Sequence, residues 1–393
     1  MSDLPFLVVG GGIAGLGAAL GLSGLGAGVR LFEQAAAFEE VGAGLQMSPN
    51  GVRALQALGA WDAVEPSCVI PSEIHVKDGV SGALLQRIRL GKTFENRFGA
   101  PYRVCHRADL LAGLVATARN RPAIELRNSS AVTGVELAVA QAALVLDVGE
   151  TAAGRAVIAA DGIRSRLRQE VCGKVDPVHR GHLIHRGLIP LKSVPPEIEI
   201  DCVTLWLCPG GHVVHYPVSN WRSFNIVAAV DGTAAEGGWQ QPAGSDEMMR
   251  HFPAVVEDLS ALLAAVPDWR RWQGADLPEL PRWSKGNLVL AGDAAHATLP
   301  YLAQGAVMAL EDAVVLSQQV RTASSLGSAF TTYESLRRAR TSRIQAQSRR
   351  MGWAYHARGA TALARNAVLR LGGGVAVRQM EWIFGWSPDM IIR

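Results

Sequence analysis

Residues 6–33 read FLVVGGGIAGLGAALGLSGLGAGVRLFE, and they carry the strongest structural signal in the chain. Its first four residues form an apolar run that is typical of a buried parallel strand. Gly10, Gly12 and Gly15 follow in the pattern Gly-x-Gly-x-x-Gly, at the start of a helix rich in alanine and leucine. A second apolar run, residues 29–32, ends in Glu33, where a carboxylate can accept hydrogen bonds from both hydroxyls of a ribose. The stretch therefore predicts a strand, turn and helix that bind a dinucleotide.

Each part of this turn has a physical role. Gly10 allows a tight turn with positive φ, Gly12 lets a pyrophosphate approach the backbone, and Gly15 lets the helix pack against the strand. The free N–H groups of Ile13 and Ala14 at the helix start then face the phosphates. The chain contains 42 glycines in 393 residues, so this spacing alone arises easily by chance. The two flanking strands and the acidic residue carry the prediction.

A membrane or signal segment is the alternative for this region, because residues 4–29 carry no charge and are long enough to span a bilayer. Nine glycines lie within the segment, and Asp3 precedes it where a signal peptide carries positive charge. No small-residue cleavage site follows it. We therefore expect no membrane association.

Composition favours an ordinary globular protein, with 49% apolar and 19% charged residues and a net charge of +3. This charge is too small to indicate a polyanionic partner, so no nucleic acid is expected. The five cysteines are odd in number and lack Cys-x-x-Cys spacing, which favours reduced thiols in the cytoplasm. The pairs His182/His185 and His212/His215 lie in strand-like segments, where an offset of three places side chains on opposite faces. We therefore expect no metal at either pair.

Further along the chain, two more apolar strands end in aspartate. Residues 156–160 stop at Asp161, and residues 287–290 stop just before Asp293. The carboxyl ends of parallel strands meet at one edge of a sheet, so these two residues and the glycine turn are expected to lie together. Other strands are predicted at 73–77, 84–90, 124–126, 143–148, 183–189, 203–207, 213–217 and 224–230, the last four as a separate antiparallel sheet. Helices are predicted at 51–58, 107–119, 246–265 covering that sheet, 306–320, and from 328 to the C-terminus with a break at 372–374.

The segment 337–350 is rich in arginine. Such a segment can attract nucleic acid or lipid, but no aromatic stripe accompanies the charge. Leu336 and Ile344 stand at core spacing. A solvated face of a helix is the favoured interpretation.

Three separated motifs together resemble a known family. They are residues 10–15 with Glu33, the segment Ala-Asp-Gly-Ile-Arg-Ser at 160–165, and Gly-Asp-Ala-Ala-His at 292–296 followed by Leu-Pro-Tyr-Leu-Ala-Gln-Gly at 299–305. These look like the signatures of the single-component FAD-dependent aromatic hydroxylases, most closely the salicylate, 3-hydroxybenzoate and 6-hydroxynicotinate monooxygenases. Further matches lie at 42–46 with 49–50, at 106–110 and at 215–217.

The resemblance implies how FAD is held. Glu33 is expected to bind the adenosine ribose, Arg107 the pyrophosphate or ribityl region, and Asp293 the ribityl hydroxyls. Asp161 is implied to serve both FAD and the incoming nicotinamide. Backbone N–H groups near Gly305, at a helix start, would face the flavin N1, where reduced flavin carries negative charge. The full implied set for non-covalent FAD is Gly10, Gly12, Ile13, Ala14, Gly15, Glu33, Gln46, Arg107, Asp161, Gly292, Asp293, Gly305 and Ala306.

The implied activity is a monooxygenase reaction that uses NADH or NADPH and O2. A flavin C4a-hydroperoxide would transfer oxygen to a phenolic or hydroxy-N-heteroaromatic acid, with or without decarboxylation. The ring must be activated by loss of a hydroxyl proton, so a base is needed nearby. The period of two along residues 212–217 places His212, Val214 and Tyr216 on one face, with Val213 and His215 on the other.

The first of these faces is the expected catalytic face. His212 is the candidate to hold or deprotonate the substrate hydroxyl, and Tyr216 the candidate to orient the ring or its acid group. The resemblance adds Pro300 beside them, and Met47 and Tyr301 as lining of the same cavity. Arg186 can pair with a substrate carboxylate, support the sheet or lie over the flavin, and these alternatives stay open. Which of His212, His215 and Tyr216 acts on the substrate also stays open.

The predicted fold class is α/β, with a Rossmann-like FAD-binding domain around a mostly parallel sheet, a smaller substrate domain with an antiparallel sheet, and C-terminal helices. The expected boundaries are 1–75, 101–180 and 283–340 for the first domain, 76–100 and 181–282 for the second, and 341–393 for the helical segment. A monomer and a homodimer are both compatible with the sequence. Alternatives on the same scaffold are a halogenase, an epoxidase, a reductase or a flavin redox sensor. A halogenase would call for Trp-x-Trp-x-Ile-Pro, which residues 269–272 do not supply.

Overall fold

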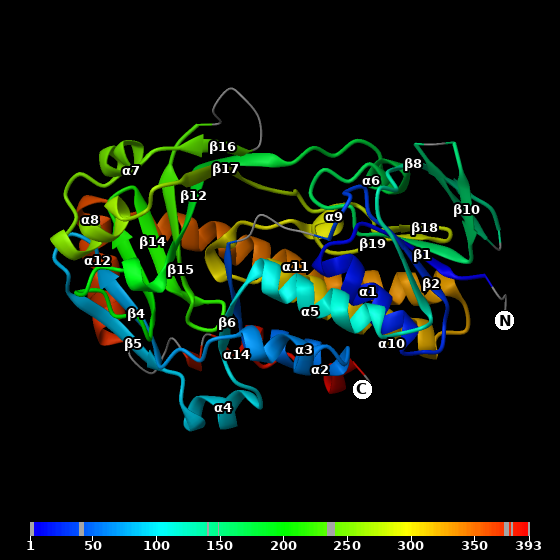
Figure 1. The fold of residues 1–393 in the computed structure, drawn as a ribbon, viewed down its shortest axis with the longest axis horizontal. Coiled ribbons are helices and arrows are strands. Elements are labelled where there is room, and N and C mark those ends of the chain that lie inside the picture. Colours follow the sequence, from blue (N-terminus) through cyan, green and yellow to red (C-terminus); the bar gives the residue numbers. More distant parts are fainter. Residues whose placement is uncertain are drawn as a thin grey trace.

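The computed structural model describes residues 4–38, 43–139, 141–147, 149–233, 240–372, 377–378 and 380–391. Residues 42, 148 and 373–374, which belong to the predicted loop, strand and helix break, lie outside these ranges. Figure 1 shows two sheets at opposite ends of the molecule, with the long helix α11 (Leu326–Tyr355) running along both. The site is built where these two ends meet.

A six-stranded sheet forms the nucleotide-binding end. Its central strand pairs in parallel with a neighbour on each side, and all four of its residues are buried, as its apolar sequence predicts. Only the short edge strand runs antiparallel. The carboxyl ends of the central strands therefore share one edge, which carries the three predicted motifs. In sheet order the strands are β18 (Ser284–Lys285), β19 (Leu288–Leu290), β11 (Ala156–Ala159), β1 (Phe6–Val9), β2 (Val29–Phe32) and β7 (Ile124–Arg127).

The turn after β1 has the geometry that its glycines predict. Gly10 has φ +103°, a conformation that residues with a side chain rarely adopt. A Cβ on Gly15 would lie 1.9 Å from the carbonyl oxygen of Gly10, so only glycine allows helix α1 (Ile13–Ser23) to approach the turn this closely. Helices α5 (Arg107–Arg119) and α10 (Gly305–Thr322) pack beside α1.

An eight-stranded sheet forms the other end. It is antiparallel except where β13 and β4 pair in parallel, so the predicted sheet is larger and more mixed than expected. A separate apolar core lies between this sheet and two helices, α7 (Ser245–His251) and α8 (Glu257–Ala264). The prediction of one helix over 246–265 is wrong, because the chain breaks at Pro253. In sheet order the strands are β16 (Gln240–Ala243), β17 (Trp269–Asp276), β12 (Val178–Pro190), β15 (Ser223–Asp231), β14 (Gly211–Val218), β13 (Val203–Cys208), β4 (Glu73–Asp78) and β5 (Leu84–Arg89).

Arg337 and Arg340 of α11 do not belong to a solvated face, which corrects the prediction for part of 337–350, whereas Arg343 and Arg350 are exposed as predicted. Arg337 is 1% exposed and lies 2.7 Å from Glu311 and 2.6 Å from Asp312 of α10. Arg340 also pairs with Glu311, at 2.7 Å. The acidic partners are distant in sequence, so the local pattern of α11 could not reveal them.

Smaller elements connect the two ends. Within the described part of the chain, every helix is too short or too polar to cross a lipid bilayer.

All five cysteines are free thiols. The predicted domain division stays a prediction, although α11 runs unbroken through its boundary at 340/341. The remaining elements are β3 (Gly44–Met47), α2 (Pro49–Ala57), α3 (Trp61–Val64), η1 (Glu65–Ser67), α4 (Lys92–Phe98), β6 (Arg103–His106), β8 (Val132–Leu137), β9 (Ala142–Leu146), β10 (Thr151–Gly154), α6 (Leu167–Cys172), η2 (Leu191–Ser193), α9 (Asp293–His296), η3 (Pro300–Leu302), α12 (Gly359–Leu371), α14 (Glu381–Phe384) and η4 (Pro388–Ile391).

Candidate active site

One cavity of about 980 Å³ joins the two ends of the molecule. Its lining includes residues from each of the three nucleotide motifs and from the face of β14 that was predicted to be catalytic. The sequence separates these segments by up to about 300 residues, and the fold brings them together. Predicted site residues that line this cavity are Gly10, Gly12, Ile13, Ala14, Glu33, Gln46, Arg107, Asp161, Arg186, His212, Val214, Tyr216, Asp293, Pro300, Tyr301, Gly305 and Ala306.

The first turn offers an anion site at the cavity edge. Gly12 precedes α1 without a side-chain cap, so the first N–H groups of this helix are free to meet a phosphate. A Cβ on Gly12 would find no atom within 4 Å, which leaves open space beside the backbone. Glu33 is held at the end of β2 because its carboxylate accepts hydrogen bonds from the N–H groups of Gly11, at 2.6 Å, and Ala35, at 2.8 Å. A ribose hydroxyl and a pyrophosphate fit this arrangement.

Two buried polar atoms at the cavity have no hydrogen-bond partner among the described residues. Asp161 Oδ2 accepts hydrogen bonds from the N–H groups of Arg166 and Leu167, at 2.9 and 3.2 Å, while Oδ1 is left without a partner. Thr298 Oγ1 is the second such atom. Buried polar atoms are nearly always paired in folded proteins. These two fit a polar ligand, and a dinucleotide such as FAD would supply hydrogen-bond partners for them.

A buried ionic network fixes the third motif. Asp312 Oδ2 accepts hydrogen bonds from the Gly292 N–H, at 2.9 Å, and lies 2.5 Å from His296 Nε2. Burial raises the pKa of Asp312, but the charges of His296 and Arg337 outweigh it and lower the pKa to about 2. The ionised carboxylate therefore holds the turn that presents Asp293 to the cavity. Sequence reasoning missed Asp312, which carries no motif signal of its own.

The start of α10 also faces the cavity. Gly305 and Ala306 line it, and Gln304 precedes them without a side-chain cap. The positive end of this 18-residue helix therefore points at the ligand space. This is the arrangement expected beside the anionic N1 region of reduced flavin.

The side chains of β14 alternate between its two faces as predicted. His212, Val214 and Tyr216 line the cavity, whereas Val213 belongs to the second apolar core. His215 points away and accepts a hydrogen bond from Trp206 Nε1 at 2.9 Å. His212 is 3% exposed, and burial, followed by the nearby His356 and His182, lowers its pKa well below the usual value.

The two tyrosines of the predicted site are neutral phenols. Burial raises the pKa of Tyr216 and of Tyr301 above the usual value. The hydroxyl of Tyr301 lies 2.6 Å from His182 Nδ1, and the ring of Tyr301 stands edge-on to His212 with centroids 5.1 Å apart. Pro300, which opens η3, places Tyr301 at this point. Both tyrosines can therefore donate a hydrogen bond near neutral pH.

Three predicted site residues do not line the cavity. Met47 is fully buried at the end of β3, with its sulfur beside Gly51 of α2. It does not line the cavity, which corrects the expectation that it lines the substrate pocket. Gly15 and Gly292 act on the backbone, the first in close packing and the second at φ +60°. Arg186 does line the cavity, where its guanidinium lies 5.0 Å from the ring centre of Trp272.

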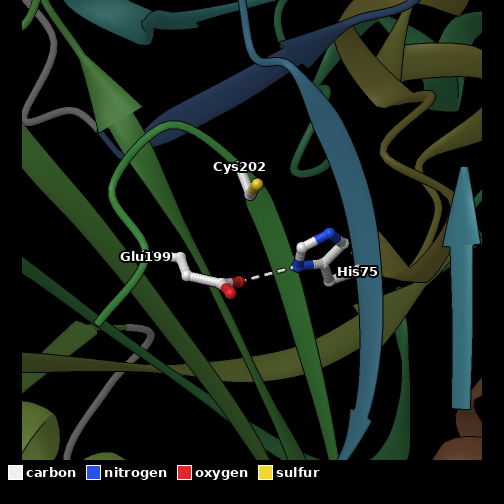
Figure 2. Close-up of side chains that lie close together, drawn as sticks. All are labelled: His75, Glu199 and Cys202. Atoms are coloured by element: carbon white, nitrogen blue, oxygen red, sulfur yellow. Dashed lines mark hydrogen bonds and ion pairs between the residues drawn. The ribbon is translucent and has the colours of Figure 1, made fainter. Parts of the chain in front are cut away.

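Figure 2 shows a separate polar cluster at the edge of the eight-stranded sheet, where His75 of β4 faces Glu199 and Cys202. His75 is bonded at both ring nitrogens, by Glu199 at 2.8 Å and Glu73 at 2.6 Å. The ammonium of Lys77, 3.3 Å from Glu199, already neutralises that carboxylate. Burial raises the pKa of the Cys202 thiol to about 11, which disfavours the thiolate that a metal needs. We interpret the cluster as an ion-pair network that ties the chain before β13 to β4.

The two predicted histidine pairs are split by the sheet, as their spacing indicates. His185 lies 3.0 Å from Glu247 on the side of α7, whereas His182 meets Tyr301 on the cavity side. Sequence reasoning also missed His356, the residue after α11, whose Nε2 lies 3.0 Å from His212 Nδ1. The two residues are 144 positions apart, so no local spacing could have shown this contact.

The fold and the site together define a dinucleotide-dependent oxidoreductase with a substrate space beside its cofactor space. Residues 3–348 match the family described as "FAD binding domain". The 3-hydroxybenzoate 6-hydroxylase of Polaromonas naphthalenivorans is 35% identical over 390 residues, covering 98% of this chain and 97% of that protein. The 6-hydroxynicotinate 3-monooxygenase of Bordetella bronchiseptica is 31% identical, covering 88% and 91%. The crystal structure of Klebsiella pneumoniae HpxO with FAD and uric acid superposes with a TM-score of 0.85 at 26% identity, covering 99% and 97%.

The chain therefore belongs to the family of FAD-dependent aromatic hydroxylases that the three motifs predicted. Its cofactor is FAD.

Proposed function

We propose that this protein hydroxylates a phenolic or hydroxy-N-heteroaromatic acid with O2 and NADH or NADPH, with or without loss of the carboxylate. The observation that carries this proposal is the cavity of about 980 Å³. It joins the turn at Gly12 and the start of α10 to the face of β14 that bears His212 and Tyr216. A cofactor held at one end would thus meet a ring held at the other. Bound FAD would supply the redox chemistry, accepting hydride from the nicotinamide and activating O2.

The substrate end of the cavity is suited to a flat aromatic ring. Aliphatic side chains from the eight-stranded sheet form part of its walls, and such side chains exclude water and pack against a ring. A few polar groups interrupt these walls, and such groups fix the orientation of a ligand. The aliphatic lining residues are Ile74, Val76, Ile88, Val203, Leu205, Leu207, Val214 and Val227.

We assign His212 to the ring hydroxyl of the substrate. Its Nδ1 is engaged by His356, while Nε2 has no hydrogen-bond partner among the described residues. Burial keeps the imidazole neutral, so Nε2 can accept a hydrogen bond, and it can take up a proton as Nδ1 gives one up to His356. A hydroxyl that gives up its proton makes the ortho and para ring carbons electron-rich, which favours attack on electrophilic oxygen. Tyr216 is assigned to orient the ring or its acid group.

The names of two relatives support the substrate class. The Polaromonas protein is named for 3-hydroxybenzoate and the Bordetella protein for 6-hydroxynicotinate, both of which are ring acids with a hydroxyl group.

The test is a panel of phenolic, anthranilic and hydroxypyridine carboxylates, assayed for stimulated NADH oxidation and for hydroxylated product by mass. We expect at least one compound to gain one oxygen atom. Asparagine replacements on β14 then assign the base: His212→Asn should lose about 100-fold or more in hydroxylation while FAD stays bound. His215→Asn, a matched buried histidine on the opposite face, should not. Purified protein that hydroxylates none of the panel, or equal losses in the two variants, would contradict the proposal.

A further inference from the structure

A second cavity, of about 480 Å³, lies behind the catalytic face. His356 lines this second cavity, and its hydrogen-bond partner His212 lines the first. A bonded pair of imidazole rings therefore forms part of the wall between the two cavities. The charged and titratable residues around the second cavity are Arg180, His182, Asp231, Arg349, His356 and Arg358.

A continuous row of hydrogen bonds crosses this partition. His212 Nδ1 lies 3.0 Å from His356 Nε2, and His356 Nδ1 lies 2.6 Å from Asp231 Oδ1. The side chain of Asp231 is 43% exposed and also accepts a hydrogen bond from Arg358 Nη2 at 2.8 Å. The row therefore begins in the enclosed substrate space and ends at a carboxylate in contact with solvent.

The chemistry of the groups fixes the direction of each bond. An ionised carboxylate can only accept, so the proton between Asp231 and His356 belongs to His356 Nδ1. A neutral His356 then accepts at Nε2, so His212 donates from Nδ1 and keeps an open lone pair at Nε2. That lone pair faces the space where a substrate hydroxyl would be held. The resting arrangement is thus ready to take one proton in and to pass one out.

Burial explains why His212 needs such an outlet. Burial makes a positive charge on the His212 ring unfavourable and lowers its pKa, and the nearby His356 and His182 lower this pKa further. Burial also lowers the pKa of His356, but the hydrogen bond and the charge of Asp231 partly offset this effect. The groups that face the row are Tyr301 and Tyr355 beside His212, and His182, Asp231 and Arg358 beside His356.

We propose that His356 and Asp231 form a proton relay that carries the proton of the substrate's ring hydroxyl from His212 to solvent in the second cavity. The relay rests on the proposed function, since it requires a hydroxylated ring at His212. The hydroxyl proton moves to His212 Nε2, the Nδ1 proton of His212 moves to His356 Nε2, and the Nδ1 proton of His356 leaves to Asp231 or to water. The O–H electron pair stays on the ring oxygen, so one proton enters, one leaves, and the ring carries the negative charge.

A second row of side chains, from Tyr301 through His182 towards Asp231, can be compared with the row through His356. Tyr301 donates to or accepts from His182 at 2.6 Å, but His182 Nε2 lies 4.0 Å from Asp231 Oδ1. This last gap is too long for a direct hydrogen bond. The direct route therefore runs through His356, and a His182→Gln variant should slow the transfer less than a His356→Gln variant.

The experiment measures proton release. FAD-loaded protein, in weak buffer that contains a pH-indicator dye, is mixed with 3-hydroxybenzoate or with the first compound of the panel that the wild type hydroxylates. The dye reports the release of protons into solution. Ring ionisation is followed in the near-ultraviolet difference spectrum. His356→Gln and Asp231→Asn should slow proton release and hydroxylation by about tenfold or more, with unchanged FAD binding and unchanged flavin reduction by NADH. His251→Gln, a half-buried histidine on α7 that lines neither cavity, is the control.

Rescue separates a proton-transfer role from a structural one. Added imidazole should restore a substantial part of the rate to His356→Ala, because the vacated space opens on the second cavity. Asp231→Asn keeps shape at a half-exposed position, so the relay stays testable if a His356 variant folds poorly. If the wild type hydroxylates its substrate and both His356→Gln and Asp231→Asn match its rates, the relay alone is overturned. If the wild type hydroxylates nothing in the panel, the proposed function fails and the relay fails with it.

Discussion

Replacing Gly12 by alanine should separate cofactor binding from folding. In this protein Gly12 has φ −78° and ψ −173°, which alanine adopts without strain, and its Cβ would meet no protein atom within 4 Å. The gain from a less flexible unfolded chain, about 0.4–1 kcal/mol, and the loss of a good helix N-cap, roughly 0.5–1 kcal/mol, are of similar size and opposite sign. The FAD-free protein should therefore unfold with a free energy within about 1 kcal/mol of the wild type.

The same methyl group would occupy the open space where a pyrophosphate approaches the backbone. Loss of one charge-assisted hydrogen bond costs about 1.5–3 kcal/mol, which corresponds to FAD binding weakened about 10- to 150-fold. Flavin fluorescence titration of the apoprotein measures the binding, and urea unfolding measures the stability. Gly15→Ala is the contrasting variant, because its Cβ would lie 1.9 Å from the Gly10 carbonyl oxygen and should destabilise the fold itself. Wild-type FAD affinity in Gly12→Ala, or a loss of several kcal/mol in the stability of its apoprotein, would contradict the role assigned to Gly12.

Two further predictions concern the buried network between α10 and α11. Arg337→Met should lower the free energy of unfolding by about 3–5 kcal/mol in urea, because it removes a buried cation that pairs with both Glu311 and Asp312. Arg350→Met, at an exposed position of the same helix, should change it by less than about 1 kcal/mol, and equal effects would contradict the assignment. The folded-state pKa of Asp312, about 2, lies below its ordinary value, so its stabilisation is complete above about pH 4 and is lost as the pH falls towards 2. Asp312→Asn should flatten this part of the acid unfolding curve, and an unchanged pH dependence would argue against an ionised Asp312.

Local patterns predicted those parts of the molecule whose signal is local. The helix 107–119 begins and ends where its sequence indicated, and the alternation along β14 placed His212 and His215 on the faces that the structure has. The strand ends at Asp161 and Asp293 were brought together correctly because parallel strands share an edge.

What failed depended on partners distant in the chain. Arg337 was taken for a solvated residue because its acidic partners stand on another helix, 25 and 26 residues away. The prediction of one helix over 246–265 failed because Pro253 disfavours the helical conformation of the residue before it. His356 and Asp231 carry no motif, and only the packing of the end of α11 against β14 and β15 brings them to His212.

The path of α11 has a consequence for how this protein comes apart. Arg337 in the middle of α11 forms ion pairs with Glu311 and Asp312 of the cofactor half, and Tyr355 in its last turn contacts His212 of the other half. The six-stranded sheet of the cofactor half comes from three stretches of chain, and the strands of the eight-stranded sheet lie between them in the sequence. Neither half can be cut out as one continuous fragment, and we expect calorimetry to record their melting as a single cooperative event.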